Sequence, residues 1–410
     1  MMKKKLLAVF CAGLMAFSAV ACGSESSKAS ESNKESESSV KAESSVEASS
    51  GEESKQAEST EKKEAEKLEF TSKYFKLIGR TKLIDDILWF AYSGSGVEFN
   101  FKGKSCELVL RGDTMATKPD TSPRYAVYVD GEIIQKKTMD AAIEKVMAVN
   151  AADVEEHVIK VLKISEAAGC MSIMSVNCDD DAEITPTAEK QLKIEFIGDS
   201  ITCGYGVDGK LGESFAYSNE DCTKAYAYKT AQKLDADYSL VAASGHGIIS
   251  GYSGDGNKVL TQLMPDYYDK LGNGTGTFLG THSTITEDWD FSGFTPDIVV
   301  INLGTNDASY TKGDPEKIED YTIHYCEFLK VVREKNPKAK IVCVLGVMGQ
   351  DLCPALEDAV NRTNVNGDEE VYYLKLDQQG SEVVVDYHPT EASHEHAADQ
   401  VSEFIKTLLK

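Results

Sequence analysis

The 410-residue sequence has little positive charge for its size, because 43 Lys and Arg stand against 67 Asp and Glu and the formal net charge is -24. A nucleic-acid partner would need clustered basic residues, and the only Lys run with an obvious purpose is Lys3-Lys4-Lys5. Nucleic acid is therefore not an expected partner. Long apolar runs are also missing. The apolar segment 6–20 is too short to span a membrane comfortably, and no long apolar lid follows it, which disfavours a lipid substrate.

Metal-binding patterns are equally scarce. The ten cysteines show no CxxC spacing, and several of the eight beyond residue 22 lie within apolar runs, which favours buried free thiols. His394 and His396 flank Glu395, but residues two apart on a helix face different directions and make a poor metal pair. We expect no metal site and no cofactor.

The amino terminus has the layout of a bacterial secretion signal. The Lys run precedes the apolar segment, and Ala19-Val20-Ala21-Cys22 looks like a lipobox. We expect residues 1–21 to be a lipoprotein signal peptide and Cys22 to be the lipidated first residue of a protein anchored at the outer membrane face. The alternative is an ordinary signal peptide with an incidental Cys. Residues 22–67 are almost entirely Ser, Glu, Lys and Ala, which predicts a disordered tether.

Residues 68–188 contain short alternating or apolar runs broken by Gly and Asp, a spacing typical of an antiparallel β-sandwich. The pair Asp130-Gly131 between two such runs predicts a hairpin, with Val127, Val129 and Ile133 on one side of it. This segment could be a packing domain without a ligand of its own.

Residues 189–410 alternate between apolar strands and helical stretches, which predicts an α/β fold with a parallel sheet covered on both faces. Strands are expected at 194–197, 238–242, 298–303, 341–345 and 371–376, and the clearest helices at 226–236, 315–335 and 390–409. The architecture is a doubly wound, three-layer α/β/α sandwich.

Four short blocks follow the ends of these strands or precede the last helix. They are Gly198-Asp199-Ser200, Ser244-Gly245-His246-Gly247, Gly304-Thr305-Asn306-Asp307 and Asp386-Tyr387-His388-Pro389. Because loops after parallel strands gather at the carboxyl edge of the sheet, the blocks can converge there. Ser200 is the candidate nucleophile, and His388 is the candidate base because an imidazole with a pKa near 6.5 can accept a proton at neutral pH.

Each block also has a structural interpretation. The glycines at 245 and 247 can simply permit a turn, Asn306-Asp307 can cap a helix, and His388 can be an ordinary loop residue.

Taken in order, the four blocks resemble those of the SGNH (GDSL-type) hydrolase superfamily. The preceding domain resembles the amino-terminal jelly roll of carbohydrate esterase family 2 through several short motifs, among them Tyr128-Val129-Asp130-Gly131 and the spacing of His157, Lys163 and Glu166. The resemblance implies an oxyanion hole made by the backbone N–H of Ser200, the backbone N–H of Gly245 and the side chain of Asn306. Gly247 remains an alternative to Gly245.

One departure concerns the residue that orients the base. Most SGNH enzymes have two residues between acid and base, whereas only Tyr387 separates Asp386 from His388. Either Asp386 completes a triad or a backbone carbonyl orients His388 and leaves a dyad. The resemblance also places an aromatic residue before this His, so Tyr387 is expected to form a stacking wall for a sugar ring. Tyr205 and Trp289 are further candidates near the cleft.

These observations predict an extracellular serine carbohydrate esterase that removes O-acetyl groups from a polysaccharide such as xylan or glucomannan through an acyl-enzyme on Ser200. Two alternatives stay open: a short-chain acyl esterase or lipase of the same superfamily, and a catalytically silent carbohydrate-binding surface lipoprotein.

Overall fold

The protein is represented by a computed structural model that describes residues 69–410, which belong to one compact unit. The expected signal peptide, the lipidated Cys22 and the tether lie outside the described residues. No helix among residues 69–410 combines the length and the apolar character needed to cross a bilayer.

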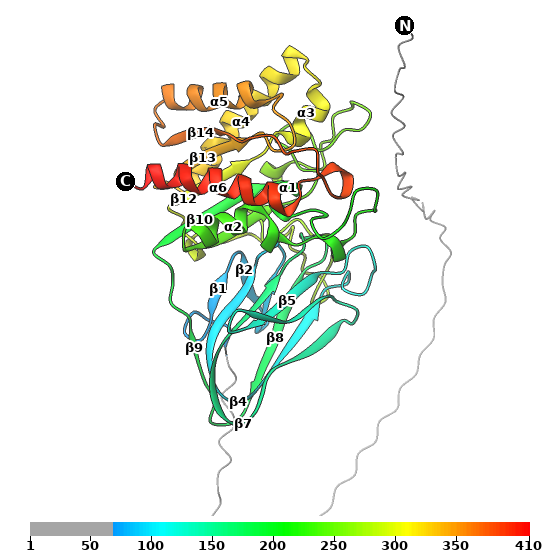
Figure 1. Ribbon diagram of the computed structural model, residues 1–410, viewed down its shortest axis with the longest axis vertical. Helices are drawn as coiled ribbons and strands as arrows, with labels where there is room; N and C mark the ends of the chain where they lie inside the picture. The colour runs from blue at the N-terminus through cyan, green and yellow to red at the C-terminus, as the bar shows by residue number, and fades with distance from the viewer. Residues whose placement is uncertain (1–68) are drawn as a thin grey trace, which may run out of the picture. The chain divides into compact units, whose positions relative to one another are not determined.

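Antiparallel strands make up the amino-terminal half of this unit (Figure 1). They are β1 (Lys76–Ile78), β2 (Thr81–Ile84), β3 (Ile87–Phe90), β4 (Gly96–Gly112), β5 (Arg124–Val129), β6 (Glu132–Thr138), β7 (Ile143–Lys163), β8 (Met171–Cys178) and β9 (Glu183–Pro186). The strand order is β2-β3-β8-β4-β7-β5-β6, and β1 and β9 also pair with β4. The long strands β4 and β7 carry the sheet around an apolar core that includes Phe75, Phe99 and Tyr125. The predicted antiparallel sandwich is confirmed.

The predicted hairpin joins β5 to β6 at Asp130 and Gly131, which both have positive φ (53° and 85°) as a two-residue hairpin turn requires. The predicted common face is wrong in part. Val127 is fully buried, but Ile133 is 50% exposed, because the two-residue turn pairs Ile133 with Tyr128 and so places it on the face opposite to Val127 and Val129.

The second half contains a parallel sheet of order β11-β10-β12-β13-β14. Its strands are β10 (Leu192–Gly198), β11 (Ala236–Ala242), β12 (Ile298–Asn302), β13 (Lys340–Leu345) and β14 (Val371–Lys375). They are mostly apolar because both faces are covered, although β10 also carries the buried Glu195. In this strand order the topological switch point lies between β10 and β12, where open α/β sheets bind ligands.

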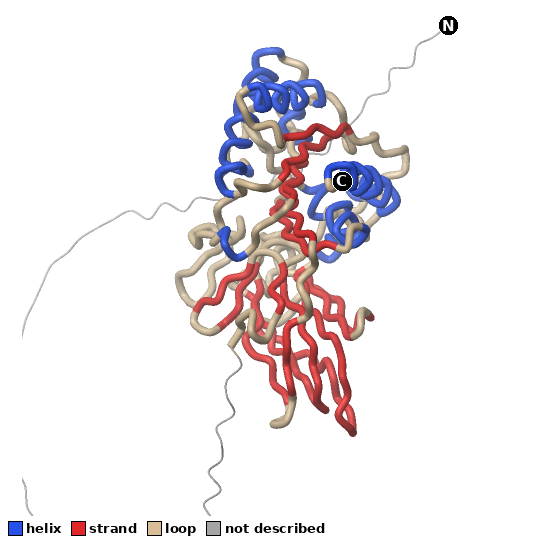
Figure 2. The backbone as a smooth tube through the Cα atoms, turned by 90° about the vertical axis from the view of Figure 1, so that its left-hand side faces the viewer, coloured by secondary structure: helices blue, strands red, loops and turns tan. Residues whose placement is uncertain are grey.

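Helices cover both faces of the sheet, as Figure 2 shows. They are α1 (Ser200–Cys203), α2 (Tyr226–Lys233), α3 (Thr305–Thr311), α4 (Pro315–Lys335), α5 (Cys353–Val365) and α6 (Glu391–Leu408), with 3-10 turns η1 (Tyr217–Asn219), η2 (Cys222–Lys224), η3 (Met264–Asp266), η4 (Phe291–Gly293) and η5 (Val385–Tyr387). Helices α4 and α5 share one apolar core with the strands, and α2 and α6 share another. The predicted three-layer arrangement is confirmed.

A buried arginine ties the two halves together. Arg80, in the turn between β1 and β2, is fully buried, and its Nη1 donates to the carbonyls of Tyr268 (2.5 Å) and Lys270 (2.8 Å). Its Nη2 lies 3.5 Å from Glu195 Oε2 on β10. The guanidinium also lies over the ring of Tyr268, at 5.2 Å from the centroid. The sandwich is therefore anchored to the parallel sheet by a buried charge whose two terminal nitrogens both have partners in the other half.

Candidate active site

Strand β10 ends in a turn that presents Ser200 at the first position of α1. Asp199 caps this helix, since its side chain accepts from the backbone N–H of Ile201 at 3.0 Å. Gly198 is required by close approach, because a Cβ there would lie 2.0 Å from Thr202 Oγ1. Ser200 is 6% exposed. The hydroxyl is thus fixed at the carboxyl edge of the sheet beside the switch point.

His388 reaches this hydroxyl from a loop 188 residues away in sequence, and its Nε2 lies 2.8 Å from Ser200 Oγ. The other ring nitrogen, Nδ1, lies 3.2 Å from the carbonyl oxygen of Val385. A carbonyl oxygen only accepts hydrogen bonds, so Nδ1 carries the proton and the lone pair of Nε2 faces the hydroxyl. This is the geometry that a general base requires.

The triad interpretation of Asp386 does not match the geometry. Its carboxylate accepts a hydrogen bond from the Tyr205 hydroxyl at 2.8 Å, while the Val385 carbonyl holds His388. In an extended segment Asp386 and His388 would point to the same side, but Asp386 (φ 48°) and Tyr387 (φ 62°) are both left-handed. This turn removes the alternation that would have placed Asp386 beside the imidazole, so the contacts form a Ser200–His388 dyad.

Aromatic rings shield the base from water. Tyr205 stacks on His388 with ring centroids 4.2 Å apart, and Phe215 stacks on the far face of Tyr205 at 3.8 Å. Burial lowers the pKa of His388 to about 4, although the Val385 carbonyl favours the protonated ring. The imidazole is therefore neutral, and competent as a base, well below the pH that its ordinary pKa implies.

The loop after β11 supplies the second candidate oxyanion donor. Gly245 has φ +76°, a conformation that favours glycine. The N–H of Gly247 donates to the Gln262 carbonyl at 3.1 Å, so it is not available to a substrate. No hydrogen bond to another residue within 69–410 engages the N–H of Gly245. Gly245, rather than Gly247, is the donor that this loop can offer together with the first-turn N–H of Ser200.

Asn306 and Asp307, in the first turn of α3, hold this loop in place. The Asn306 amide donates to the His246 carbonyl at 2.8 Å and lies 3.3 Å from Asp199 Oδ2. The Asp307 carboxylate accepts from three successive backbone N–H groups, at 3.0, 2.7 and 3.1 Å, contributed by Ile248, Ile249 and Ser250. Asn306 thus lies between the Ser200 turn and the Gly245 loop, with its amide engaged within the protein.

The other two aromatic residues predicted near the cleft, Tyr387 and Trp289, lie in different surroundings. Tyr387 is 65% exposed and adjacent to His388, and its carbonyl is held by the Gln379 side chain at 2.8 Å. Trp289 lies against Arg80, whose guanidinium carbon is 5.6 Å from the centroid of the indole ring, so this ring belongs to the surroundings of the arginine that joins the two halves. Phe215 was not predicted, since nothing in its sequence neighbourhood distinguishes it from a packing residue.

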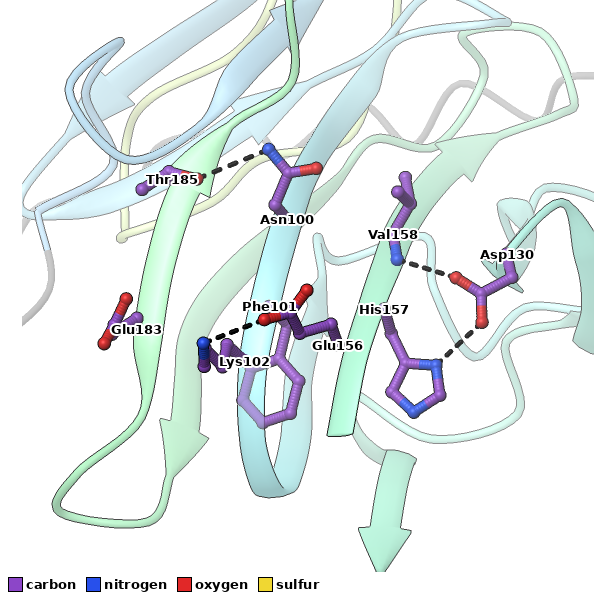
Figure 3. A pocket seen from close by; sticks show the side chains of 9 residues that line it. All are labelled: Asn100, Phe101, Lys102, Asp130, Glu156, His157, Val158, Glu183 and Thr185. Carbon is purple, nitrogen blue, oxygen red and sulfur yellow. Dashed lines mark hydrogen bonds and ion pairs between the residues drawn. The ribbon is translucent and has the colours of Figure 1, made fainter. Parts of the chain in front are cut away.

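Other titratable clusters lie outside the dyad. A cavity of about 400 Å³ opens on the sandwich and is lined by β4, β7 and β9 (Figure 3). Four of its charged or titratable groups form two pairs: His157 Nδ1 lies 2.7 Å from Asp130 Oδ2, and Lys102 Nζ lies 2.8 Å from Glu156 Oε1.

The eight cysteines of the described residues are free, and six are buried. His394 is buried and accepts from the Tyr226 N–H at 3.3 Å, whereas His396 is exposed and pairs with Asp377 at 2.9 Å. The two imidazoles of this sequence cluster thus engage different partners.

Two family models match the chain. The model described as "GDSL-like Lipase/Acylhydrolase family" matches residues 196–400, and the one described as "Carbohydrate esterase 2 N-terminal" matches residues 77–187. These matches fall on the parallel-sheet half and on the sandwich, respectively.

The chain is also similar to proteins of known name and to solved structures over most of its length. The cellulase/esterase CelE of Acetivibrio thermocellus is 31% identical over 78% of this chain, and the chain spans 37% of that protein's length. An acetylxylan esterase / glucomannan deacetylase of Cellvibrio japonicus is 23% identical over 82% of this chain and 89% of its own. A solved family two carbohydrate esterase from Clostridium thermocellum, in complex with cellohexaose, is 30% identical, with a TM-score of 0.70 over 82% of this chain and 99% of that one.

Proposed function

Because the chain belongs to the GDSL-like lipase/acylhydrolase family and carries the amino-terminal domain of carbohydrate esterase family 2, we propose that it is a serine esterase that removes O-acetyl groups from a polysaccharide. The observation that carries the proposal is the 2.8 Å contact between His388 Nε2 and Ser200 Oγ at the switch point of the sheet. A relative that deacetylates xylan and glucomannan, and another solved with cellohexaose, support a β-linked polysaccharide as the substrate class.

In the first half of the reaction, Ser200 Oγ attacks the acetyl carbonyl carbon while His388 Nε2 takes its proton. The resulting oxyanion accepts hydrogen bonds from the N–H groups of Ser200 and Gly245. Asn306 joins them by exchanging its 3.3 Å contact with Asp199 for the oxyanion. When the intermediate collapses, the C–O bond to the sugar breaks, and His388 returns its proton to the departing sugar oxygen. The acetyl group remains as an ester on Ser200.

In the second half, water attacks this ester and His388 takes a proton from the water. Collapse of the second intermediate breaks the bond to Ser200 Oγ, which regains its proton from His388, and acetate leaves. The Val385 carbonyl holds Nδ1–H throughout and stabilises the imidazolium in place of a carboxylate.

Acetate release from acetylated xylan and acetylated glucomannan tests the proposal. Wild-type protein should release acetate from at least one of them, and Ser200→Ala should release none. Faster turnover of a long-chain acyl ester than of either polysaccharide would instead support a lipase. No turnover even of 4-nitrophenyl acetate, with retained binding to cello-oligosaccharides, would support a silent carbohydrate-binding protein.

The proposal extends to location. We propose that Cys22 carries a lipid that holds the enzyme at the outer face of the cell membrane, because the Lys run, the apolar segment and Ala19-Val20-Ala21 precede it in lipobox order. Expression of the full chain in a bacterium with labelled fatty acid should label the wild type and leave Cys22→Ser unlabelled. Equal labelling of both would refute the anchor.

A further inference from the structure

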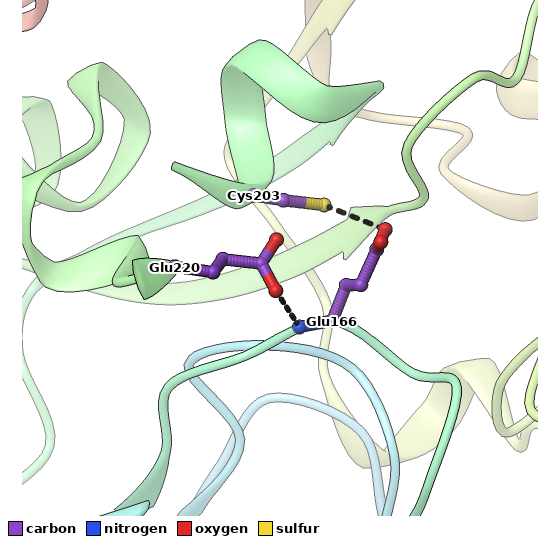
Figure 4. A group of neighbouring side chains, drawn as sticks. All are labelled: Glu166, Cys203 and Glu220. Carbon is purple, nitrogen blue, oxygen red and sulfur yellow. Dashed lines mark hydrogen bonds between the residues drawn. The ribbon is translucent and has the colours of Figure 1, made fainter. Parts of the chain in front are cut away.

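One carboxylate of the sandwich reaches into the active-site region. Glu166 follows β7 and is 8% exposed. Its Oε2 accepts from the backbone N–H of Ser244 at 2.5 Å and lies 3.7 Å from the Sγ of Cys203. Figure 4 shows the Glu166 side chain pointing toward Cys203. Ser244 directly precedes Gly245, and Cys203 ends the helix that Ser200 begins, so this side chain contacts both the oxyanion loop and the nucleophile's helix.

Glu166 is itself held firmly on the sandwich side. Its backbone N–H donates to Glu220 Oε2 at 2.9 Å, and its carbonyl accepts from the ammonium group of Lys163. Lys163 Nζ also donates to the Ser165 carbonyl at 2.6 Å. The side chain of Glu166 is therefore presented from a fixed backbone, which is what a positioning role requires.

The same residues form a compact group of possible metal ligands, since ligand atoms of Glu166, Cys203 and Glu220 lie within 4.8 Å of one another. The group already contains a buried cation, the ammonium group of Lys163. Burial lowers the pKa of Lys163 to about 8, so it stays largely cationic at neutral pH, and burial together with the neighbouring Glu166 carboxylate raises the pKa of Glu220. With the Lys163 cation in place and Glu166 Oε2 already accepting two donors, the cluster is better explained as a support for the neighbouring loop than as a cation site.

We propose that Glu166 is a positioning residue for the esterase reaction, setting the Gly245 N–H relative to Ser200 Oγ, and that the sandwich thereby forms part of the active site. The inference rests on the proposed function, because it assigns Gly245 to the oxyanion. Asp307 holds the carboxyl-terminal side of the same loop through residues 248–250, and Glu166 holds its amino-terminal side through Ser244. Gly245, with its left-handed backbone, lies between the two anchors.

Removal of the Glu166 carboxylate releases the Ser244 N–H and frees the Gly245 peptide to turn away from the oxyanion. Because an oxyanion donor acts in the transition state, the expected loss is in kcat rather than in KM. Loss of one oxyanion donor costs about 10²–10³-fold, so Glu166→Ala should lower kcat on 4-nitrophenyl acetate by about 10–100-fold. KM should change by less than about 2-fold.

Glu166→Gln is the conservative rescue. Its amide oxygen can still accept from the Ser244 N–H, so it should recover most of kcat. Glu156→Ala is the matched control, because Glu156 belongs to the same domain but is exposed and pairs only with Lys102; it should match the wild type. Phenylboronic acid, which forms a negatively charged tetrahedral adduct on a serine, provides a second readout. Its affinity should fall in parallel with kcat in Glu166→Ala and recover in Glu166→Gln.

The outcomes separate the two proposals. Full kcat and full boronate affinity in a folded Glu166→Ala protein would overturn the positioning role. Equal losses of kcat in Glu166→Ala and Glu166→Gln, accompanied by a lowered Tm in both, would also overturn it. If Glu166→Ala does not fold, Glu166→Asp replaces it, because the shorter carboxylate cannot span Ser244 and Cys203 and should show the same loss of kcat. Activity that survives in Ser200→Ala would refute the esterase proposal itself.

Discussion

The acid limb of the pH–rate profile depends on how the protein surrounds its base. His388 must be neutral to accept the Ser200 proton, and burial lowers its pKa from 6.5 to about 4. A lowered pKa means that the neutral ring survives to lower pH. The kcat/KM profile reports ionisations of the free enzyme. The midpoint of its acid limb should therefore lie near pH 4 and not near pH 6.5. The ordinary imidazole value used for the sequence would have predicted a decline between pH 7 and 5.

The size of the effect follows from the two pKa values. At pH 5.5, a base with a pKa of 6.5 is about 9% neutral, whereas one with a pKa of 4 is about 97% neutral. The wild type should accordingly keep nearly its full plateau kcat/KM at pH 5.5. Tyr205→Ala removes the ring that stacks on His388 at 4.2 Å and admits water to the imidazole. In that variant the limb should move toward pH 6, so the rate at pH 5.5 should fall while the plateau is retained.

The assay is acetate release from a soluble acetyl ester between pH 3.5 and 8, with circular dichroism at each pH to confirm that the protein stays folded. Tyr372→Ala is a suitable control, because Tyr372 lies on β14 and its hydroxyl pairs with Glu370 at 2.7 Å. An acid limb near pH 6.5 in the wild type, with no movement in Tyr205→Ala, would refute the claim that ring stacking and burial set the pKa of the base.

Three further substitutions test separate parts of the structure. Asp386→Asn should lower kcat/KM by less than about 10-fold, because the Val385 carbonyl orients His388, whereas a triad acid would cost about 10⁴-fold. Tyr387→Ala should raise KM for acetylated polysaccharide by about 2–10-fold, because it removes an exposed aromatic stacking surface, and should leave turnover of 4-nitrophenyl acetate unchanged. An equal effect on both substrates would contradict the stacking role. Arg80→Ala should lower the free energy of unfolding in urea by about 3–5 kcal/mol, because it leaves Glu195 and two carbonyls without their buried partner. The control is Arg362→Ala, which removes a side chain that is 38% exposed and should cost about 0–1 kcal/mol. Similar losses in the two variants would refute the anchoring role.

The parallel sheet and the approach of His388 to Ser200 could be predicted from the sequence for physical reasons. Strands buried on both faces appear as unbroken apolar runs, as from Ile298 to Ile301, and the turn residues that end them are equally visible. Loops at the carboxyl ends of neighbouring strands must then meet, whatever their distance along the chain. Side-chain chemistry that follows a strand end is therefore predictable in both kind and place.

Backbone features were harder to predict, because they leave little trace in residue type. The left-handed turn at Asp386 and Tyr387 places two consecutive non-glycine residues at positive φ, which residue type does not reveal, so the sequence leaves open whether Asp386 or a backbone carbonyl orients His388. The group that does hold the imidazole is the carbonyl of Val385, which any residue would supply. The lowered pKa of His388 likewise depends on Tyr205 and Phe215, whose stacking on the base is a tertiary contact.

Glu166 also makes a contact between the two domains that the sequence does not reveal. Its spacing from Lys163 was visible in the sequence as a feature of the sandwich, but its partner Ser244 belongs to a loop of the other sheet. The oxyanion loop is thus anchored by two carboxylates from different domains, Asp307 on one side and Glu166 on the other. Arg80 joins the same two halves through Glu195, in the middle of β10, so the sandwich cannot shift without disturbing the loop that carries Gly245. A domain that could have served only for packing is, on this geometry, a structural component of the catalytic centre.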